Sequence, residues 1–157
     1  NLPLEFRFEK RSRRPALDPF NATLNYCYGI LYNKIEAFMI RAGLDPQIGV
    51  FHKEQHRRPV LVFDVIEIFR HWAEYPVIES FQSKILRMEH FEIKPDMVHI
   101  NGTGKRIIVE LFFAYLNEKV MWEKESRKRI VHIKSYIDAF AVKMKNFAPD
   151  AKKTSGI

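Results

Sequence analysis

The stretch DPFNATLNYCYGILYNKIEAFMIRAG, residues 18–43, decides the fold of this chain because it carries one complete helix with both of its ends. Asp18 can accept backbone N–H bonds ahead of the first turn, and Pro19 is pre-set for the first helical position. Gly43 supplies the C-terminal stop. The apolar side chains that recur at helical spacing between these ends are Leu24, Cys27, Leu31, Ile35 and Phe38. We therefore expect a first helix over residues 18–42.

A second row on this helix carries hydrogen-bonding side chains. Its members are Asn21, Asn25, Tyr28 and Tyr32. The row lies beside the apolar stripe, and most such rows simply face solvent. Cys27 belongs to the apolar stripe, so we expect a small buried hydrophobe in a reducing compartment and no nucleophilic role for its thiol.

Proline, asparagine and glycine residues further along the sequence predict more helices and little sheet. Pro59 sets the start of the next helix, and Pro76 should kink or divide that helix. Asn101 with Gly102 marks the turn into another helix. Helices are expected over about 60–74, 76–88, 104–122 and 124–146, with at most a short strand over 97–100. The predicted fold class is all-α, one helical domain of about five to seven helices.

Length and charge bound the kind of protein and its partners. The 157 residues suffice for one domain with a hydrophobic core and are too few for two full domains. The 26 Lys and Arg side chains outnumber the 19 Asp and Glu side chains, which gives a formal net charge of +7. A polyanion is therefore a more plausible partner than an acidic protein or a neutral small molecule.

No part of the sequence favours a membrane or secreted protein. The most apolar run, residues 107–116, is interrupted by Glu110 and is shorter than the roughly 20 apolar residues that cross a bilayer. The first ten residues carry too many charges for a signal peptide. We expect a soluble, cytoplasmic protein with no membrane partner.

Two carboxylates within an apolar segment give the strongest indication of chemistry. Asp64 and Glu67 lie three residues apart, and a helix would place them on one face. A stretch this apolar should be buried, and burying ionised carboxylates is unfavourable unless a cation or strong donors meet them. His52, just ahead of the segment, adds a nitrogen ligand. One nitrogen with two oxygens suits Mn²⁺ or Mg²⁺, whereas a structural zinc ion prefers cysteine and histidine.

The same residues also have a purely structural interpretation. Asp64 would cap a helix, and Glu67 would pair with Arg70 three residues later. His52 would then be an ordinary loop residue. Spacing alone does not choose between this interpretation and the metal site.

Four blocks of the sequence stand in an order and at a spacing that are typical of one protein family. They are RRPALDPFNA at residues 13–22, YGIL at 28–31, AGLDP at 42–46 followed by Gly49 and His52, and FDVIEIFR at 63–70. Together they resemble the CRISPR-associated adaptation endonuclease and integrase (Cas one), specifically its C-terminal helical catalytic domain. The resemblance covers about residues 5–75, and the rest fits only loosely as the later helices of the family.

The resemblance implies a metal-dependent DNA nuclease and integrase, which joins the 3′-hydroxyl ends of a short spacer duplex into a repeat array by attack on phosphodiesters. His52 matches the metal-binding histidine of the family, and Glu67 matches its acidic ligand. Asp64 matches a second catalytic acid, which we expect to orient the ligands rather than bind the ion. The implied cofactor is Mg²⁺ or Mn²⁺. Arg70, one turn after Glu67, is expected to hold a carboxylate rather than DNA.

The family's other metal-binding glutamate and its dimerising β domain lie upstream of the matching blocks and are not in this sequence. Residues 1–147 are therefore expected to form the helical catalytic domain without them, followed by a disordered tail over 148–157. By itself such a chain should be nearly inactive. The implied partners are DNA, the small CRISPR-associated subunit Cas two, and a second copy that pairs through the missing domain.

Arginine and lysine side chains flanking the first helix are the best candidates for DNA contacts, because guanidinium groups suit phosphate through paired hydrogen bonds. The candidates are Arg11, Arg13 and Arg14 before the helix, and Lys53, Arg57 and Arg58 after His52. Such contacts position a backbone and need not read sequence.

Two other functions remain open from the residues alone. The chain could be a helical nucleic-acid-binding module with no chemistry, or an architectural fragment that scaffolds an active partner. Divalent-ion-dependent nicking or strand transfer by the intact protein separates the enzyme from both.

Overall fold

The structure is a computed structural model that describes residues 2–46 and 60–147. Within these ranges it is mostly helical, as the sequence predicted. It also has two short antiparallel hairpins, of which the sequence predicted only the strand over 97–100. The elements are η1 (Leu4–Phe6), α1 (Pro19–Arg41), α2 (Val60–Phe69), α3 (His71–Gln82), η2 (Met88–His90), β1 (Phe91–Lys94), β2 (Met97–Ile100), α4 (Gly102–Asn117), β3 (Lys119–Trp122), β4 (Glu125–Lys128) and α5 (Arg129–Phe147).

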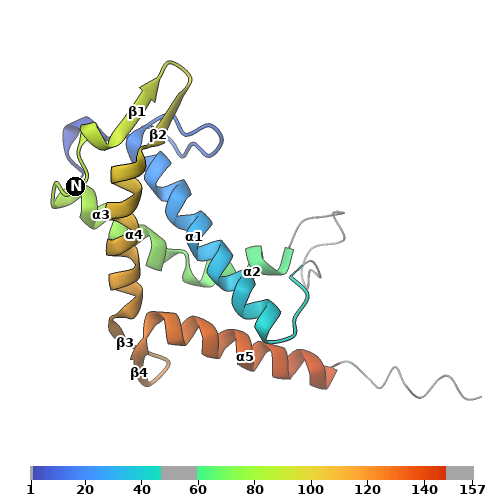
Figure 1. Cartoon of the computed structure of the whole chain (residues 1–157). Coiled ribbons are helices and arrows are strands. Elements are labelled where there is room, and N and C mark those ends of the chain that lie inside the picture. The colour runs from blue at the N-terminus through green and yellow to red at the C-terminus, as the bar shows by residue number, and fades with distance from the viewer. Residues whose placement is uncertain (1, 47–59, 148–157) are drawn as a thin grey trace, which may run out of the picture.

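Helix α1 is the central element of the molecule. It contacts α2, α3, α4, α5 and β2. Figure 1 shows the β1–β2 hairpin near the start of α1 and α5 crossing near its end, with β3 and β4 at the corner where α4 passes into α5. Elements from the rest of the chain therefore pack along the whole length of α1, while Gly29, Asn33 and Ile40 remain exposed.

The predicted ends of α1 are confirmed. The Asp18 carboxylate accepts a 2.7 Å hydrogen bond from the Asn21 backbone N–H, and Pro19 occupies the first turn. Gly43 has φ +78°, a left-handed conformation that favours glycine, and its N–H bonds to the carbonyl of Ile40. The buried stripe continues from Cys27 through its later members, except that Met39 is fully buried where Phe38 was expected.

The prediction that Pro76 divides the second helix is wrong. Helix α2 ends at Phe69, and α3 begins at His71 and continues through Pro76, which is buried inside it. The ring of a helical proline clashes with the carbonyl four residues earlier, here that of Trp72, so the distortion falls upstream of the proline. The break itself lies further upstream, at Arg70, which becomes the junction of two helices.

The predicted long helices over 104–122 and 124–146 are each shortened by a hairpin that the sequence did not reveal. Helix α4 ends at Asn117 and α5 begins at Arg129. Between them β3 pairs antiparallel with β4. Their turn residues, Glu123 and Lys124, have φ of 47° and 69°, the positive values of a two-residue hairpin turn. The predicted strand over 97–100 is present, paired with β1.

Gly104 marks a close approach between α4 and the β1–β2 hairpin. A Cβ added there would meet the Ile100 side chain at 2.7 Å and the His90 carbonyl oxygen at 2.8 Å. Because the oxygen belongs to the backbone, the contact cannot be relieved by a side-chain rotation. We expect Gly104→Ala to lower the free energy of unfolding by about 1–3 kcal/mol, measured by urea denaturation. Gly102→Ala, which meets nothing within 4 Å, is the matched control and should change stability little.

Candidate metal and DNA site

The structure describes some of the predicted site residues and not others. His52, Lys53, Arg57 and Arg58 lie outside the described residues. The carboxylates and the remaining arginines are described. They are Asp64, Glu67, Arg70, Arg11, Arg13 and Arg14.

The acid pair lies on α2, whose opposite face is held in the core by Val62, Val65 and Phe69. The expectation of burial is wrong for Glu67, whose side chain is 62% exposed, because the apolar residues of α2 face the core on its other side. Asp64 is half-buried, with its Oδ2 atom enclosed. Residues three apart on a helix are neighbours, so the two carboxylates share one face. Their oxygen atoms are the ligands that Mg²⁺ and Mn²⁺ take in proteins, so the donor chemistry fits. Among the described residues, no three His, Cys, Asp or Glu side chains form a ready metal cluster.

Arg70, at the α2–α3 junction, contacts a carboxylate on each side. Its Nη1 atom lies 2.7 Å from Glu67 Oε2, and its Nε atom lies 3.3 Å from Glu74 Oε1. The expected pairing of Arg70 with Glu67 is therefore present. Both interpretations of the acid pair predicted this contact, so it does not choose between them.

Tyr28 on α1 completes this arrangement. Its hydroxyl donates to Glu74 Oε1 at 2.5 Å and accepts from Arg70 Nε and Nη2 at 3.3 and 3.2 Å. The Arg70 guanidinium also lies 5.3 Å from the centre of the Tyr28 ring. Burial, and then the bond to Glu74, raise the pKa of the Tyr28 hydroxyl, so it stays protonated and remains a donor near neutral pH.

Arg11 joins the same face of α1 from the preceding loop. Its guanidinium donates to Asn21 Oδ1 at 2.7 Å and to Asn25 Oδ1, and lies 5.7 Å from the centre of the Tyr28 ring. Burial lowers the pKa of this guanidinium from its ordinary value. Asn21 is fully buried and also donates to the Asp18 carboxylate. These bonds fix the loop before α1 to the helix.

The expectation that the second row of α1 faces solvent is wrong for Asn21, Asn25 and Tyr28. Their partners are Arg11, on the loop before the helix, and the Arg70–Glu74 pair, more than 40 residues further on. Helical periodicity places the row on one face but does not say what covers it. The row itself was the available signal, since polar side chains at regular helical spacing also suit a buried polar interface.

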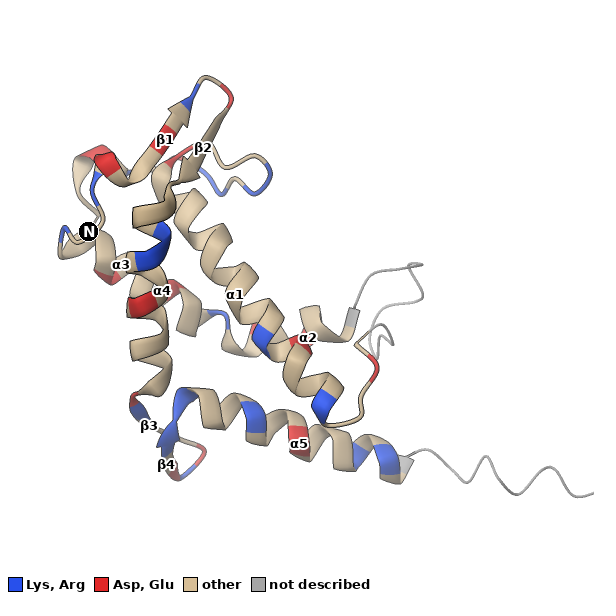
Figure 2. Cartoon of the chain, in the orientation of Figure 1, with Lys and Arg blue, Asp and Glu red and all other residues tan. Residues whose placement is uncertain are grey.

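The other two arginines predicted to contact DNA from the loop before α1 differ from Arg11. Arg13 and Arg14 are exposed. The carbonyl of Arg13 accepts a 2.6 Å bond from Asn25 Nδ2, so the backbone is held while the side chain is free to reach outward. Figure 2 shows the basic residues of this loop next to the β1–β2 hairpin, apart from the second group of basic residues on β3, β4 and α5.

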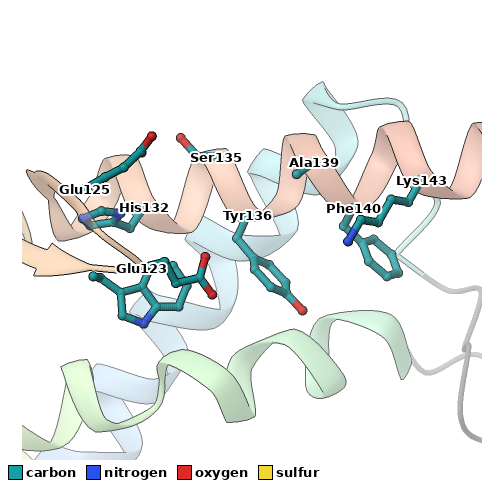
Figure 3. A pocket seen from close by; sticks show the side chains of 9 residues that line it. Glu123, Glu125, His132, Ser135, Tyr136, Ala139, Phe140 and Lys143 are labelled. Atoms are coloured by element: carbon teal, nitrogen blue, oxygen red, sulfur yellow. The ribbon is translucent and has the colours of Figure 1, made fainter.

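A cavity of about 380 Å³ lies between the β3–β4 hairpin and α5, away from the acid pair (Figure 3). Trp122, Tyr136 and Phe140 form its apolar walls, and Glu123 and Lys143 bring charge to it. Its lining includes neither Arg70 nor the partners of Arg70, which are Glu67, Glu74 and Tyr28. Trp122 packs edge-on against Phe69 of α2, with ring centres 5.4 Å apart, which fixes the hairpin against the helix that carries the carboxylates.

Solved structures that share this fold include a casposase and structures that contain Cas1. A casposase bound to integration product superposes with a TM-score of 0.84 and 26% identity over 92% of this chain and 42% of that one. A Cas6-RT-Cas1–Cas2 complex gives a TM-score of 0.79 and 25% identity over 92% of this chain and 16% of that one. A CAS1 protein from Thermotoga maritima gives 0.78 and 25% over 88% of this chain and 44% of that one.

Residues 1–114 match the family model described as CRISPR associated protein Cas1, and the chain belongs to this family. It is 35% identical over 116 residues to CRISPR-associated endonuclease Cas1 1 of Thermus thermophilus, covering 73% of this chain and 37% of that protein. It is 28% identical over 155 residues to CRISPR-associated endonuclease Cas1 2 of Saccharolobus solfataricus, covering 99% and 48%. The chain spans less than half the length of these relatives.

No helix of the described residues is long and apolar enough to cross a membrane. The buried thiol of Cys27 has its pKa raised by burial, which agrees with the predicted structural role.

Proposed function

We propose that the full-length protein is a metal-dependent DNA endonuclease and integrase of CRISPR adaptation, which joins the 3′-hydroxyl ends of a spacer duplex into a repeat array by transesterification. The observation that carries the proposal is the acid pair on α2 in a chain of the Cas1 family. Relatives named as endonucleases and a structural neighbour bound to an integration product support the reaction class.

In this proposal His52 and Glu67 hold the divalent ion, and Asp64 orients the ligands around it. Mg²⁺ or Mn²⁺ fits the carboxylate oxygens, and a bound ion of this kind supplies charge stabilisation at the scissile phosphate. The Glu67 side chain is exposed, so its carboxylate is accessible to an ion from solvent. Asp64 is half-buried, which suits a residue that positions others.

DNA is proposed to follow the basic side chains that flank α1. These are Arg11, Arg13 and Arg14 before the helix, and Lys53, Arg57 and Arg58 after it. Arg13 and Arg14 are exposed, whereas Arg11 is engaged with two asparagines and acts mainly by holding the loop in place. The proposed partners are the small subunit Cas two, as in the Cas1–Cas2 complex that shares this fold, and a second copy of the protein.

The experiment that tests the reaction is strand transfer of a labelled duplex into a repeat-containing plasmid by the full-length protein. Activity should require Mg²⁺ or Mn²⁺ and should disappear with a chelator. DNA binding without nicking or transfer in either ion would contradict the enzyme and favour the non-catalytic binding module.

Affinity for DNA should come mainly from phosphate neutralisation by the flanking arginines. Each phosphate contact steepens the fall of log K with log salt by about 0.9 for duplex DNA. Replacing Arg13, Arg14, Arg57 and Arg58 together by alanine should flatten that slope by roughly 2 to 4 units and change sequence preference little, measured by fluorescence anisotropy over a salt series.

The matched control for this variant removes the same charge from the last hairpin and helix. Its substitutions are Lys128→Ala, Lys134→Ala, Lys143→Ala and Lys145→Ala. An unchanged slope in the arginine variant, with a flattened slope in the lysine variant, would place the DNA along α5 instead.

A further inference from the structure

Arg70 stands where two helices meet, midway between two carboxylates. Its backbone carbonyl accepts hydrogen bonds from the N–H groups of Ala73 and Glu74 at 2.9 and 3.2 Å, which fixes its backbone at the start of α3. Glu67 lies one turn earlier on α2, and Glu74 lies one turn later on α3. One guanidinium therefore has a possible partner on either side.

The two partners hold Arg70 differently. The contact to Glu67 is short, 2.7 Å, and its carboxylate is 62% exposed. The contact to Glu74 is longer, 3.3 Å, and both side chains in that pair are 37% exposed. Arg70 is thus drawn towards the solvent-facing carboxylate while remaining within reach of the more enclosed one.

Tyr28 and Glu74 together form a second position that can hold the Arg70 guanidinium. Its hydroxyl donates to Glu74 Oε1 at 2.5 Å and accepts from two nitrogen atoms of Arg70. The ring face of Tyr28 lies under the guanidinium, 5.3 Å away, which favours a cation there. A small rotation at the end of the Arg70 side chain would break its contact with Glu67 and preserve its contacts with Tyr28 and Glu74.

A cation bound to Glu67 and the Arg70 guanidinium compete for the same carboxylate oxygens and repel each other. We propose that Arg70 is a positioning residue that exchanges between Glu67 and the site formed by Tyr28 and Glu74, so that this site sets how readily Glu67 accepts a divalent ion. The inference rests on the proposed function only in taking Glu67 as an ion ligand.

The proposed exchange determines whether each substitution raises or lowers the affinity for Mn²⁺. Tyr28→Phe and Glu74→Gln weaken the site that receives Arg70, so the guanidinium stays on Glu67 and the affinity for Mn²⁺ falls. Each should cost about threefold to tenfold, the effect of one lost hydrogen bond in a partly exposed position. Arg70→Gln removes the competing cation, so the affinity for Mn²⁺ rises.

The test is a titration of the full-length protein with Mn²⁺ alone, in which the free ion is measured by electron paramagnetic resonance. Glu79→Gln is the matched control, because it removes the same charge from an exposed position on α3 and should leave the affinity unchanged. Thermal unfolding of each variant checks that it is folded. Tyr28→Phe changes no charge and therefore isolates the hydrogen bond from simple electrostatics.

The double variant Glu74→Gln with Arg70→Gln distinguishes an effect of Glu74 that acts through Arg70 from a direct electrostatic effect of Glu74 on the ion. If Glu74 acts through Arg70, its substitution has no effect once Arg70 is gone. An equal effect of Glu74→Gln with and without Arg70, or an unchanged affinity in Tyr28→Phe, overturns the inference. Glu67→Gln reports on the proposed function itself: if this variant binds Mn²⁺ as tightly as the unaltered protein, the ligand assignment fails, whatever the other variants do.

Discussion

Replacing His52 or Glu67 by alanine is expected to abolish Mn²⁺- or Mg²⁺-dependent strand transfer by the full-length protein while leaving DNA binding largely intact. Loss of a ligand removes the ion that stabilises charge at the phosphate, whereas the arginines that contact the backbone are untouched. The assay is transfer of a labelled duplex into a plasmid, run beside an anisotropy measurement of DNA affinity.

Asp64→Asn should reduce the rate less than either ligand substitution, because Asp64 is half-buried on α2 and is assigned to orient the ligands. Glu79→Ala, on the exposed side of α3, serves as the control for loss of a negative charge. Full activity in the His52→Ala protein would show that this histidine is not part of the site.

The isolated 157-residue chain should be nearly inactive in strand transfer and should gain little thermal stability from Mg²⁺. The proposed set within this sequence supplies one imidazole and one or two carboxylates, and Mg²⁺ keeps its waters unless several well-placed oxygens replace them. Stabilisation by a bound ligand follows its affinity, so weak binding gives a small shift in Tm.

The measurement compares the isolated chain with the full-length protein in the same transfer assay and in thermal unfolding with and without Mg²⁺. Circular dichroism of the isolated chain confirms its helical fold before activity is compared. Transfer by the isolated chain at the rate of the full-length protein would contradict the expectation that this ligand set is too small to hold the ion.

The first helix could be predicted almost to the residue because its signals are local. Asp18 and Pro19 start α1 and Gly43 ends it by bonds within a few residues of each other. The β3–β4 hairpin could not be predicted in the same way, because β4 is exposed along its whole length and shows no alternation of polar and apolar side chains. Its turn at Glu123 and Lys124 also lacks the glycine or asparagine that usually marks positive φ.

The shared helix face of the acid pair was predictable from the sequence, and the contacts around it were not. The spacing of Asp64 and Glu67 predicts a shared helix face, and the structure has them on α2. The role of Tyr28 depends on Glu74, which lies 46 residues away and is brought near by the packing of α3 on α1. Contacts between residues so far apart leave no periodic pattern in a sequence. The fold was therefore needed to reveal the set of contacts that links Arg70, Glu74 and Tyr28.

The most direct test of the proposed ion site is a crystal structure of the full-length protein with Mn²⁺, using anomalous diffraction at the manganese absorption edge to locate the ion. We expect an anomalous peak at coordination distance from the Glu67 carboxylate and the His52 imidazole, with the Arg70 guanidinium moved onto Tyr28 and Glu74. A peak remote from both ligands, with Glu67 still paired to Arg70, would contradict the proposed site.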